Sequence, residues 1–111
     1  MKACFMGLGY IGLPTAIIAA KHGIQITGVD INPVVVEKTN AGKLHIVEPG
    51  LAKMLREVVV AGMLHAATEP EVCDAYFIVV PTPFKGDHEP DVSYVEAATR
   101  AVIPYLKEGD L

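Results

Sequence analysis

Apolar residues along this chain fall into two alternating patterns, short β-type runs and longer stretches with helical spacing. The β-type runs are rich in β-branched and aromatic residues, and glycine or polar turns separate them from the helical stretches. This alternation predicts an α/β fold built on a parallel sheet. It predicts strands at 2–6, 24–30, 63–67 and 75–81 and helices at 10–22, 33–40, 48–62 and 91–107, with a short turn or helix at 68–72.

Local signals set the ends of these elements. We expect Asn32 to cap the second helix and Pro33 to occupy its first turn, where the missing N–H costs little. Asp91 is the expected cap of the last helix, and Gly109 is its expected stop. The run at 75–81, AYFIVVP, is apolar throughout, which predicts a strand buried on both faces.

A glycine motif, Gly7-x-Gly9-x-x-Gly12, lies directly between the first strand and the first helix. In that context each glycine has a physical role in binding a dinucleotide. Gly7 permits the tight turn, Gly9 lets the backbone approach a pyrophosphate, and Gly12 lets the helix pack close to the sheet. The pyrophosphate would then rest on the free N–H groups at the start of that helix.

An acidic residue, Asp30, ends the second strand, 23 residues after Gly7, where about 20 is usual for the ribose-binding carboxylate of a dinucleotide site. A carboxylate there accepts hydrogen bonds from the ribose hydroxyls and repels a 2′-phosphate, so the cofactor we expect is NAD rather than NADP. The structural alternative is that the glycines only make a turn and Asp30 only caps a helix. The common register of strand, glycines, helix and Asp30 favours the cofactor site.

Composition limits what else the chain can do. Its 111 residues, 51% hydrophobic and 20% charged, suit one small packed domain. A net charge of −4 argues against nucleic acid or an anionic membrane as partner. Glycines and Pro14 interrupt the N-terminal apolar run, so it predicts neither a signal peptide nor a membrane span. Two cysteines make no disulfide framework, and a cytoplasmic location fits.

Residues with further chemistry are few. The four histidines show no metal-ligand spacing, and we expect no metal site. The segment VPTPFKGDHEPD begins at the carboxyl end of the most apolar strand, the edge at which open α/β sheets bind ligands. Thr82 lies there between two prolines, and its hydroxyl could contact the cofactor or bond its own backbone in a turn. Its place on the sheet favours the cofactor contact.

Taken together, GLGYIGLPTA, GVDIN, HIVEPGLA, VPTPFKGDHEPD and SYVEAA resemble the N-terminal part of the nucleotide-sugar 6-dehydrogenases. The resemblance runs almost from end to end of the chain. It implies oxidation of the sugar's C6 alcohol to a carboxylate with two NAD⁺ and a cysteine thioester, and HIVEP and PTPFKGDHEPD best match members that act on UDP-N-acetyl-D-mannosamine. UDP-N-acetylglucosamine and UDP-glucose remain alternative substrates. The positions that match the family's NAD contacts are Gly7, Gly9, Tyr10, Ile11, Gly12, Asp30 and Thr82.

The resemblance also implies what these 111 residues do not contain. The expected fold is a Rossmann-like three-layer α-β-α parallel sheet, truncated after the fourth strand and its following helix, so residues 1–111 would be an incomplete NAD-binding domain without catalytic and substrate domains. Neither Cys4 nor Cys73 matches the family's catalytic cysteine, and we expect no catalytic residue here. An exposed sheet edge predicts a homo-oligomer. The alternative function is a stand-alone module that senses NAD or docks onto a partner.

Overall fold

The protein folds around a four-stranded parallel sheet with the strand order β3-β2-β1-β4. This computed structural model describes residues 1–45, 49–80, 84–85, 89–90 and 93–111. The strands of the sheet are β1 (Lys2–Met6), β2 (Gln25–Val29), β3 (Leu64–Ala67) and β4 (Ala75–Ile78). A separate antiparallel pair, β5 (Phe84–Lys85) and β6 (Glu89–Pro90), follows β4.

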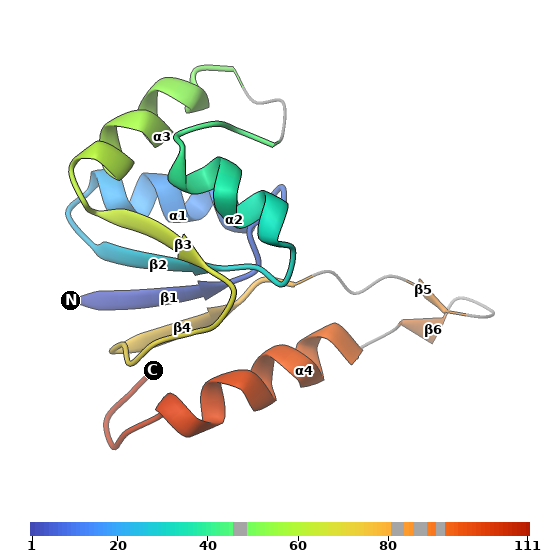
Figure 1. Ribbon diagram of the computed structural model, residues 1–111. Helices are drawn as coiled ribbons and strands as arrows, with labels where there is room; N and C mark the ends of the chain where they lie inside the picture. The colour runs from blue at the N-terminus through green and yellow to red at the C-terminus, as the bar shows by residue number, and fades with distance from the viewer. Residues whose placement is uncertain (46–48, 81–83, 86–88, 91–92) are drawn as a thin grey trace.

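Helices cover both faces of the sheet, which confirms the predicted three-layer Rossmann-like fold (Figure 1). One face carries α1 (Gly12–Lys21), α2 (Pro33–Asn40) and α3 (Leu51–Val60). The opposite face carries α4 (Ser93–Val102), which a short 3₁₀ turn, η1 (Ile103–Tyr105), extends.

The order of the strands fixes where a ligand can bind. From β1 the chain steps outward through β2 to β3, and then returns to the other side of β1 to form β4. The sheet therefore reverses its winding between β1 and β4, and open α/β sheets bind ligands in the crevice at the carboxyl ends of the strands beside such a reversal. Both the glycine motif and the segment that follows β4 begin at this edge.

The larger part of the core lies between the sheet and the helices α1 and α3. Alternate residues of the strands, such as Phe5 and Ile26, point to this face, where they meet Ile17 of α1 and Leu55 of α3. Gly28 in β2 makes room for the fully buried Leu8, whose Cδ2 would lie 2.7 Å from a Cβ at that position. The glycine motif is thereby packed onto the sheet by its own leucine.

A smaller core lies between the sheet and α4. Cys4 and Met6 of β1 point to this face with Val29, and Ala98 and Val102 of α4 pack against them. Because the contacting side chains of α4 are small, the helix can lie close to the sheet.

Strand β4 is shorter and less buried than its sequence predicts. It ends at Ile78, and Phe77 and Ile78 are 41% and 36% exposed, so the expectation of a strand buried on both faces is wrong. The reason is its place in the sheet, because β4 pairs with β1 on one side only among the strands described. Phe77 stacks on Phe5 at a centroid distance of 4.9 Å and remains open on its other side.

The predictions for residues 68–72 and for the end of the last helix also differ from the structure. Residues 68–74 form bends and irregular chain without a helix. The Tyr76 hydroxyl holds this segment by accepting from the Cys73 N–H at 2.8 Å. The last α-helix ends at Val102 rather than near 107, because Pro104 cannot continue its hydrogen bonds. Asp91, its expected cap, lies outside the described residues. Within the described ranges, no helix is long and apolar enough to cross a membrane.

Candidate functional site

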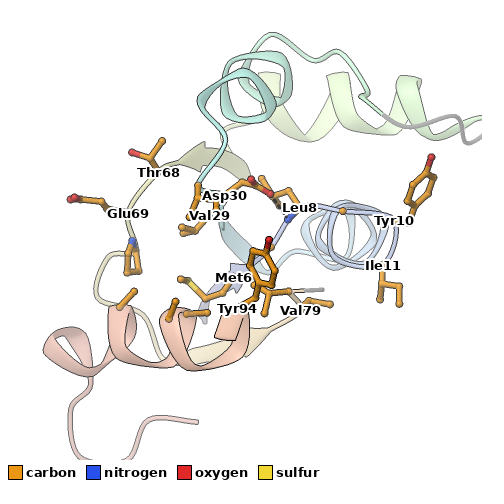
Figure 2. A pocket seen from close by; sticks show the side chains of 18 residues that line it. Met6, Leu8, Tyr10, Ile11, Val29, Asp30, Thr68, Glu69, Val79 and Tyr94 are labelled. Atoms are coloured by element: carbon orange, nitrogen blue, oxygen red, sulfur yellow. Dashed lines mark hydrogen bonds between the residues drawn. The ribbon is translucent and has the colours of Figure 1, made fainter. Parts of the chain in front are cut away.

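A pocket of about 660 Å³ opens at the carboxyl end of the sheet, beside the reversal between β1 and β4 (Figure 2). One wall consists of residues 7–11 of the glycine loop (residues 7–12) with the ends of β1 and β2. The other walls are residues 68–70 after β3, Val79 and Val80 after β4, and one side of α4. Most of the lining is apolar, and Asp30 contributes a carboxylate. This combination suits a ligand with a flat apolar part and a few polar groups.

Two of the three glycines are required by the fold itself. Gly7 has φ +115°, and a Cβ there would overlap with the carbonyl oxygen of Val79. A Cβ on Gly12 would overlap with the carbonyl oxygen of Gly7. Glycine at these two positions lets the loop turn tightly after β1 and lets α1 begin directly against the loop. The Gly7 N–H also donates to Val29 O at 2.7 Å, which ties the turn to β2. Any protein with this turn would need them.

The third glycine is different. Gly9 does not have a positive φ, and a Cβ built there meets no atom within 4 Å. Neither the backbone conformation nor protein packing therefore requires a glycine at this position. Gly9 does line the pocket, so the space that its missing side chain leaves belongs to the pocket. A ligand that must approach the backbone closely gives a physical reason for this glycine.

The start of α1 lies at the same place, and the N-terminus of a helix favours a negative charge. The helix begins at Gly12 after an Ile11 that provides no side-chain cap, and its first turn holds no acidic residue. The Leu13 N–H already donates to Gly9 O at 3.1 Å, and Pro14 has no N–H. What this end offers an anion is therefore the positive end of the helix dipole and the N–H groups of residues 10–12. Together with Gly9 they form an arrangement that fits the pyrophosphate of a dinucleotide.

Asp30 is held in place by the loop that it faces. Its Oδ2 accepts from the Leu8 N–H at 3.1 Å, and its Oδ1 accepts from the Asn32 N–H at 3.0 Å. Each oxygen keeps a further lone pair with which to accept from a ribose hydroxyl. The cap of α2 is Asn32, whose Oδ1 accepts from the Val34 N–H at 3.0 Å, as the sequence predicts. The alternative that Asp30 serves as a helix cap therefore loses its basis.

The remaining predicted site residues have different surroundings. Tyr10 and Ile11 lie at the mouth of the pocket, and they are 74% and 72% exposed. In Figure 2 both lie on the opposite side of the pocket from Thr68. Thr82 lies outside the described residues. The structure thus brings Gly7, Gly9, Tyr10, Ile11 and Asp30 to one pocket, at which α1 begins with Gly12.

Sequence reasoning missed the wall that α4 contributes. Tyr94, Ala97 and Ala101 line the pocket from one side of this helix, at the i, i+3 and i+7 positions that share a face. Figure 2 shows the Tyr94 ring extending from α4 toward the glycine loop. The spacing of small residues in SYVEAATRA is a signal for a close-packed face, but it does not say that a pocket lies against that face.

The two thiols lie away from this chemistry and are poor nucleophiles. Cys4 and Cys73 are both buried and free. Burial, with a smaller contribution from the neighbouring Cys73, raises the pKa of Cys4 to about 12. Burial is also the main cause that raises the pKa of Cys73. Both therefore remain protonated at neutral pH.

Comparison with known proteins places this geometry in a family. A family model described as the NAD-binding domain of the UDP-glucose/GDP-mannose dehydrogenase family matches residues 1–111. The UDP-N-acetyl-D-mannosamine dehydrogenase of Campylobacter jejuni is 55% identical over 111 residues, which are 99% of this chain and 27% of that protein. The NDP-N-acetyl-D-galactosaminuronic acid dehydrogenase of Ralstonia nicotianae is 54% identical over 106 residues, 96% of this chain and 25% of that protein.

The solved structures agree with the sequence relatives. The UDP-N-acetyl-mannosamine dehydrogenase Cap5O of Staphylococcus aureus superposes with a TM-score of 0.96 at 44% identity, over 99% of this chain and 27% of that one. The chain thus spans about a quarter of the length of the relatives that it matches. The family model nevertheless matches all 111 residues of this chain. The chain therefore belongs to the UDP-glucose/GDP-mannose dehydrogenase family, as its NAD-binding domain.

Proposed function

We propose that this chain binds NAD in the pocket between the glycine loop and α4, with the pyrophosphate on the N-terminus of α1. Asp30 accepts the adenosine ribose hydroxyls, and the apolar wall made by Ala97 and Ala101 takes the adenine. Gly7, Tyr10, Ile11 and Gly12 shape or flank the loop, and Thr82 contacts the cofactor from the segment after β4. The observation that carries the proposal is Gly9, a glycine that the fold does not need and that lines the pocket.

We further propose that the protein to which this domain contributes is a UDP-N-acetyl-D-mannosamine 6-dehydrogenase. NAD supplies the hydride acceptor for oxidation of the sugar's C6 alcohol. This domain's own residues bind and orient the cofactor, and the nucleophilic thiol comes from elsewhere, since burial keeps Cys4 and Cys73 protonated. Support for this sugar is the 55% identity to the C. jejuni enzyme, and the 54% identity to the R. nicotianae enzyme makes its nucleotide sugar the second candidate.

The cofactor proposal is tested by calorimetric titration of the chain with NAD⁺ and NADP⁺. We expect saturable NAD⁺ binding, weaker NADP⁺ binding, and an affinity for NAD⁺ at least about tenfold lower in Asp30→Ala, since a charge-assisted hydrogen bond contributes about 1.5–3 kcal/mol. Glu108→Ala, which removes an exposed carboxylate beyond η1, is the matched control and should bind as the wild type does. A folded wild-type chain that binds no NAD⁺ would contradict the proposal.

We also propose that the chain is cytoplasmic and that it self-associates through β4. The Tyr76 N–H donates to Leu111 O at 2.6 Å. The outer edge of β4 therefore already forms a backbone hydrogen bond with another segment near the start of the strand. Phe77 and Ile78, at its other end, are partly exposed apolar residues beside that edge. Such an edge favours pairing with a second copy. Size-exclusion chromatography across micromolar concentrations should show a dimer, and a monomer throughout would exclude this pairing.

A further inference from the structure

A histidine outside the pocket holds the backbone of the glycine loop. His45 follows the turn that ends α2, where Gly42 has φ +74° and the Lys43 N–H donates to Lys38 O at 2.8 Å. Leu44, between Lys43 and His45, is partly buried against the larger core. The turn at the end of α2 and the packing of Leu44 direct the chain back toward the loop between β1 and α1. They thereby set the position of His45, which is half-buried.

The contact between His45 and the loop is a hydrogen bond of defined direction. Nε2 of His45 lies 2.5 Å from the carbonyl oxygen of Leu8. A carbonyl oxygen only accepts, so Nε2 must carry the hydrogen. The N–H of the same leucine donates to Asp30, and its side chain is fully buried over Gly28. Both backbone groups of Leu8 are thus held by side chains from other parts of the chain.

This bond determines where the next N–H points. The peptide that joins Leu8 to Gly9 is trans, as are the other described peptide bonds, so its C=O and its N–H point in opposite directions. With the carbonyl held toward His45, the Gly9 N–H points to the other side of the loop, and Gly9 lines the pocket. We propose that His45 is a positioning residue for the cofactor, which aims the Gly9 N–H at the pyrophosphate. This inference rests on the proposed function.

A merely structural role for His45 makes a different prediction. A bond that only ties the segment after α2 to the loop would stabilise the fold without changing the relative affinity for different ligands. A bond that aims one N–H at a phosphate should affect ligands that carry the pyrophosphate and spare adenosine, which lacks it. The ratio of the two affinities therefore separates the two roles.

The test compares His45→Leu and His45→Gln in titrations with NAD⁺ and with adenosine. Leucine removes the donor, and we expect NAD⁺ affinity to fall about five- to tenfold, the worth of about one hydrogen bond. Glutamine offers an N–H at a similar reach and should keep the NAD⁺ affinity within about twofold of the wild type. Adenosine affinity should stay constant in all variants. His22→Leu, the same change at an exposed histidine after α1, is the matched control.

A second measurement does not depend on any variant. In ¹⁵N NMR of the free wild-type chain, the His45 ring should carry hydrogen on Nε2, and the Gly9 amide signal should shift on addition of NAD⁺ but not of adenosine. A neutral ring protonated on Nδ1 alone overturns the inference. So does His45→Leu that binds NAD⁺ as the wild type does, or that loses adenosine to the same degree. Each of those results refutes the role of His45 but leaves the proposed NAD binding of the wild type standing. A wild type that binds no NAD⁺ refutes the proposed function and the role of His45 with it.

Discussion

Replacing Gly9 with alanine should weaken cofactor binding without harming the fold. The added methyl meets no protein atom within 4 Å, and the backbone at this position does not have a positive φ. Alanine also restricts the unfolded chain more than glycine does, which stabilises a protein by about 0.4–1 kcal/mol where the native conformation suits both residues. We therefore expect Gly9→Ala to unfold at a temperature equal to or slightly above that of the wild type.

The effect on binding has the opposite sign. The methyl would occupy the space through which the pyrophosphate approaches the backbone N–H, so the phosphate would have to move away by about the size of a methyl group. Loss of one or two charge-assisted hydrogen bonds corresponds to about 1.5–3 kcal/mol each, and we expect the affinity for NAD⁺ to fall by at least about tenfold.

Gly12→Ala is the contrasting variant in the same loop. Its methyl would overlap with the carbonyl oxygen of Gly7, so the start of α1 would have to move. Overpacking of this kind costs about 1–3 kcal/mol or more, which lowers the melting temperature of a domain of this size by roughly 4–12 °C. Thermal unfolding followed by circular dichroism and calorimetric titration with NAD⁺ measure both effects. If Gly9→Ala unfolds early, or if it binds NAD⁺ as the wild type does, the reasoning that assigns Gly9 to the ligand is wrong.

Three further predictions concern the rest of the molecule. Leu55→Ala empties a fully buried core position and should cost about 2–5 kcal/mol in urea unfolding; a smaller cost would mean that α3 packs loosely. Cys4, with its pKa raised to about 12, should react with a thiol reagent at neutral pH only after denaturation. The hydrogen bond from Thr27, with smaller contributions from Lys2 and His65, lowers the pKa of Glu71. The ionised Glu71 therefore stabilises the fold above the ordinary pKa of 4.5, and this stabilisation is lost as the pH falls through the lowered pKa of the folded state. Wild type and Glu71→Gln should accordingly converge in free energy of unfolding at low pH.

The size of the Glu71 effect is limited by its surroundings. Its side chain is 37% exposed, and its ion pair with Lys2 measures 3.2 Å at the surface, so solvent screening keeps the difference at neutral pH to about 1 kcal/mol or less. A stability difference that grows on acidification would contradict the sign of the pKa shift.

The elements that local chemistry determines could be predicted from the sequence. The strand expected at 2–6 is confirmed as β1, and the helix expected at 33–40 is confirmed as α2 with Asn32 as its cap. In both cases the signals lie within or next to the element: a β-type run for the strand, and a capping side chain with a proline for the helix. Nothing distant in the chain was needed to place them.

Burial in β4 could not be predicted in the same way, because it depends on neighbours. AYFIVVP is apolar on both sides, yet Phe77 and Ile78 remain partly exposed where the sheet has its edge. An apolar run reports that a strand can be buried, and the strand order decides whether it is. The end of α4 is a different case, since Pro104 was visible in the sequence and marks the end of the helix.

The candidate site divides along the same line. Gly7 and Gly12 belong to one short turn, and Asp30 ends the strand next to β1. The spacing of these residues in the sequence was therefore enough to predict where they lie. His45 acts on Leu8 across 37 positions in the sequence, and the alanines of α4 face the pocket only because β4 returns beside β1. Short-range residues thus make the loop that we propose binds the phosphates. Long-range contacts fix the orientation of its peptides and form the opposite wall of the pocket. Substitutions at Gly9 and at His45 should therefore weaken NAD⁺ binding by different routes, the first by filling the space and the second by turning the donor away, and only the second should be rescued by glutamine.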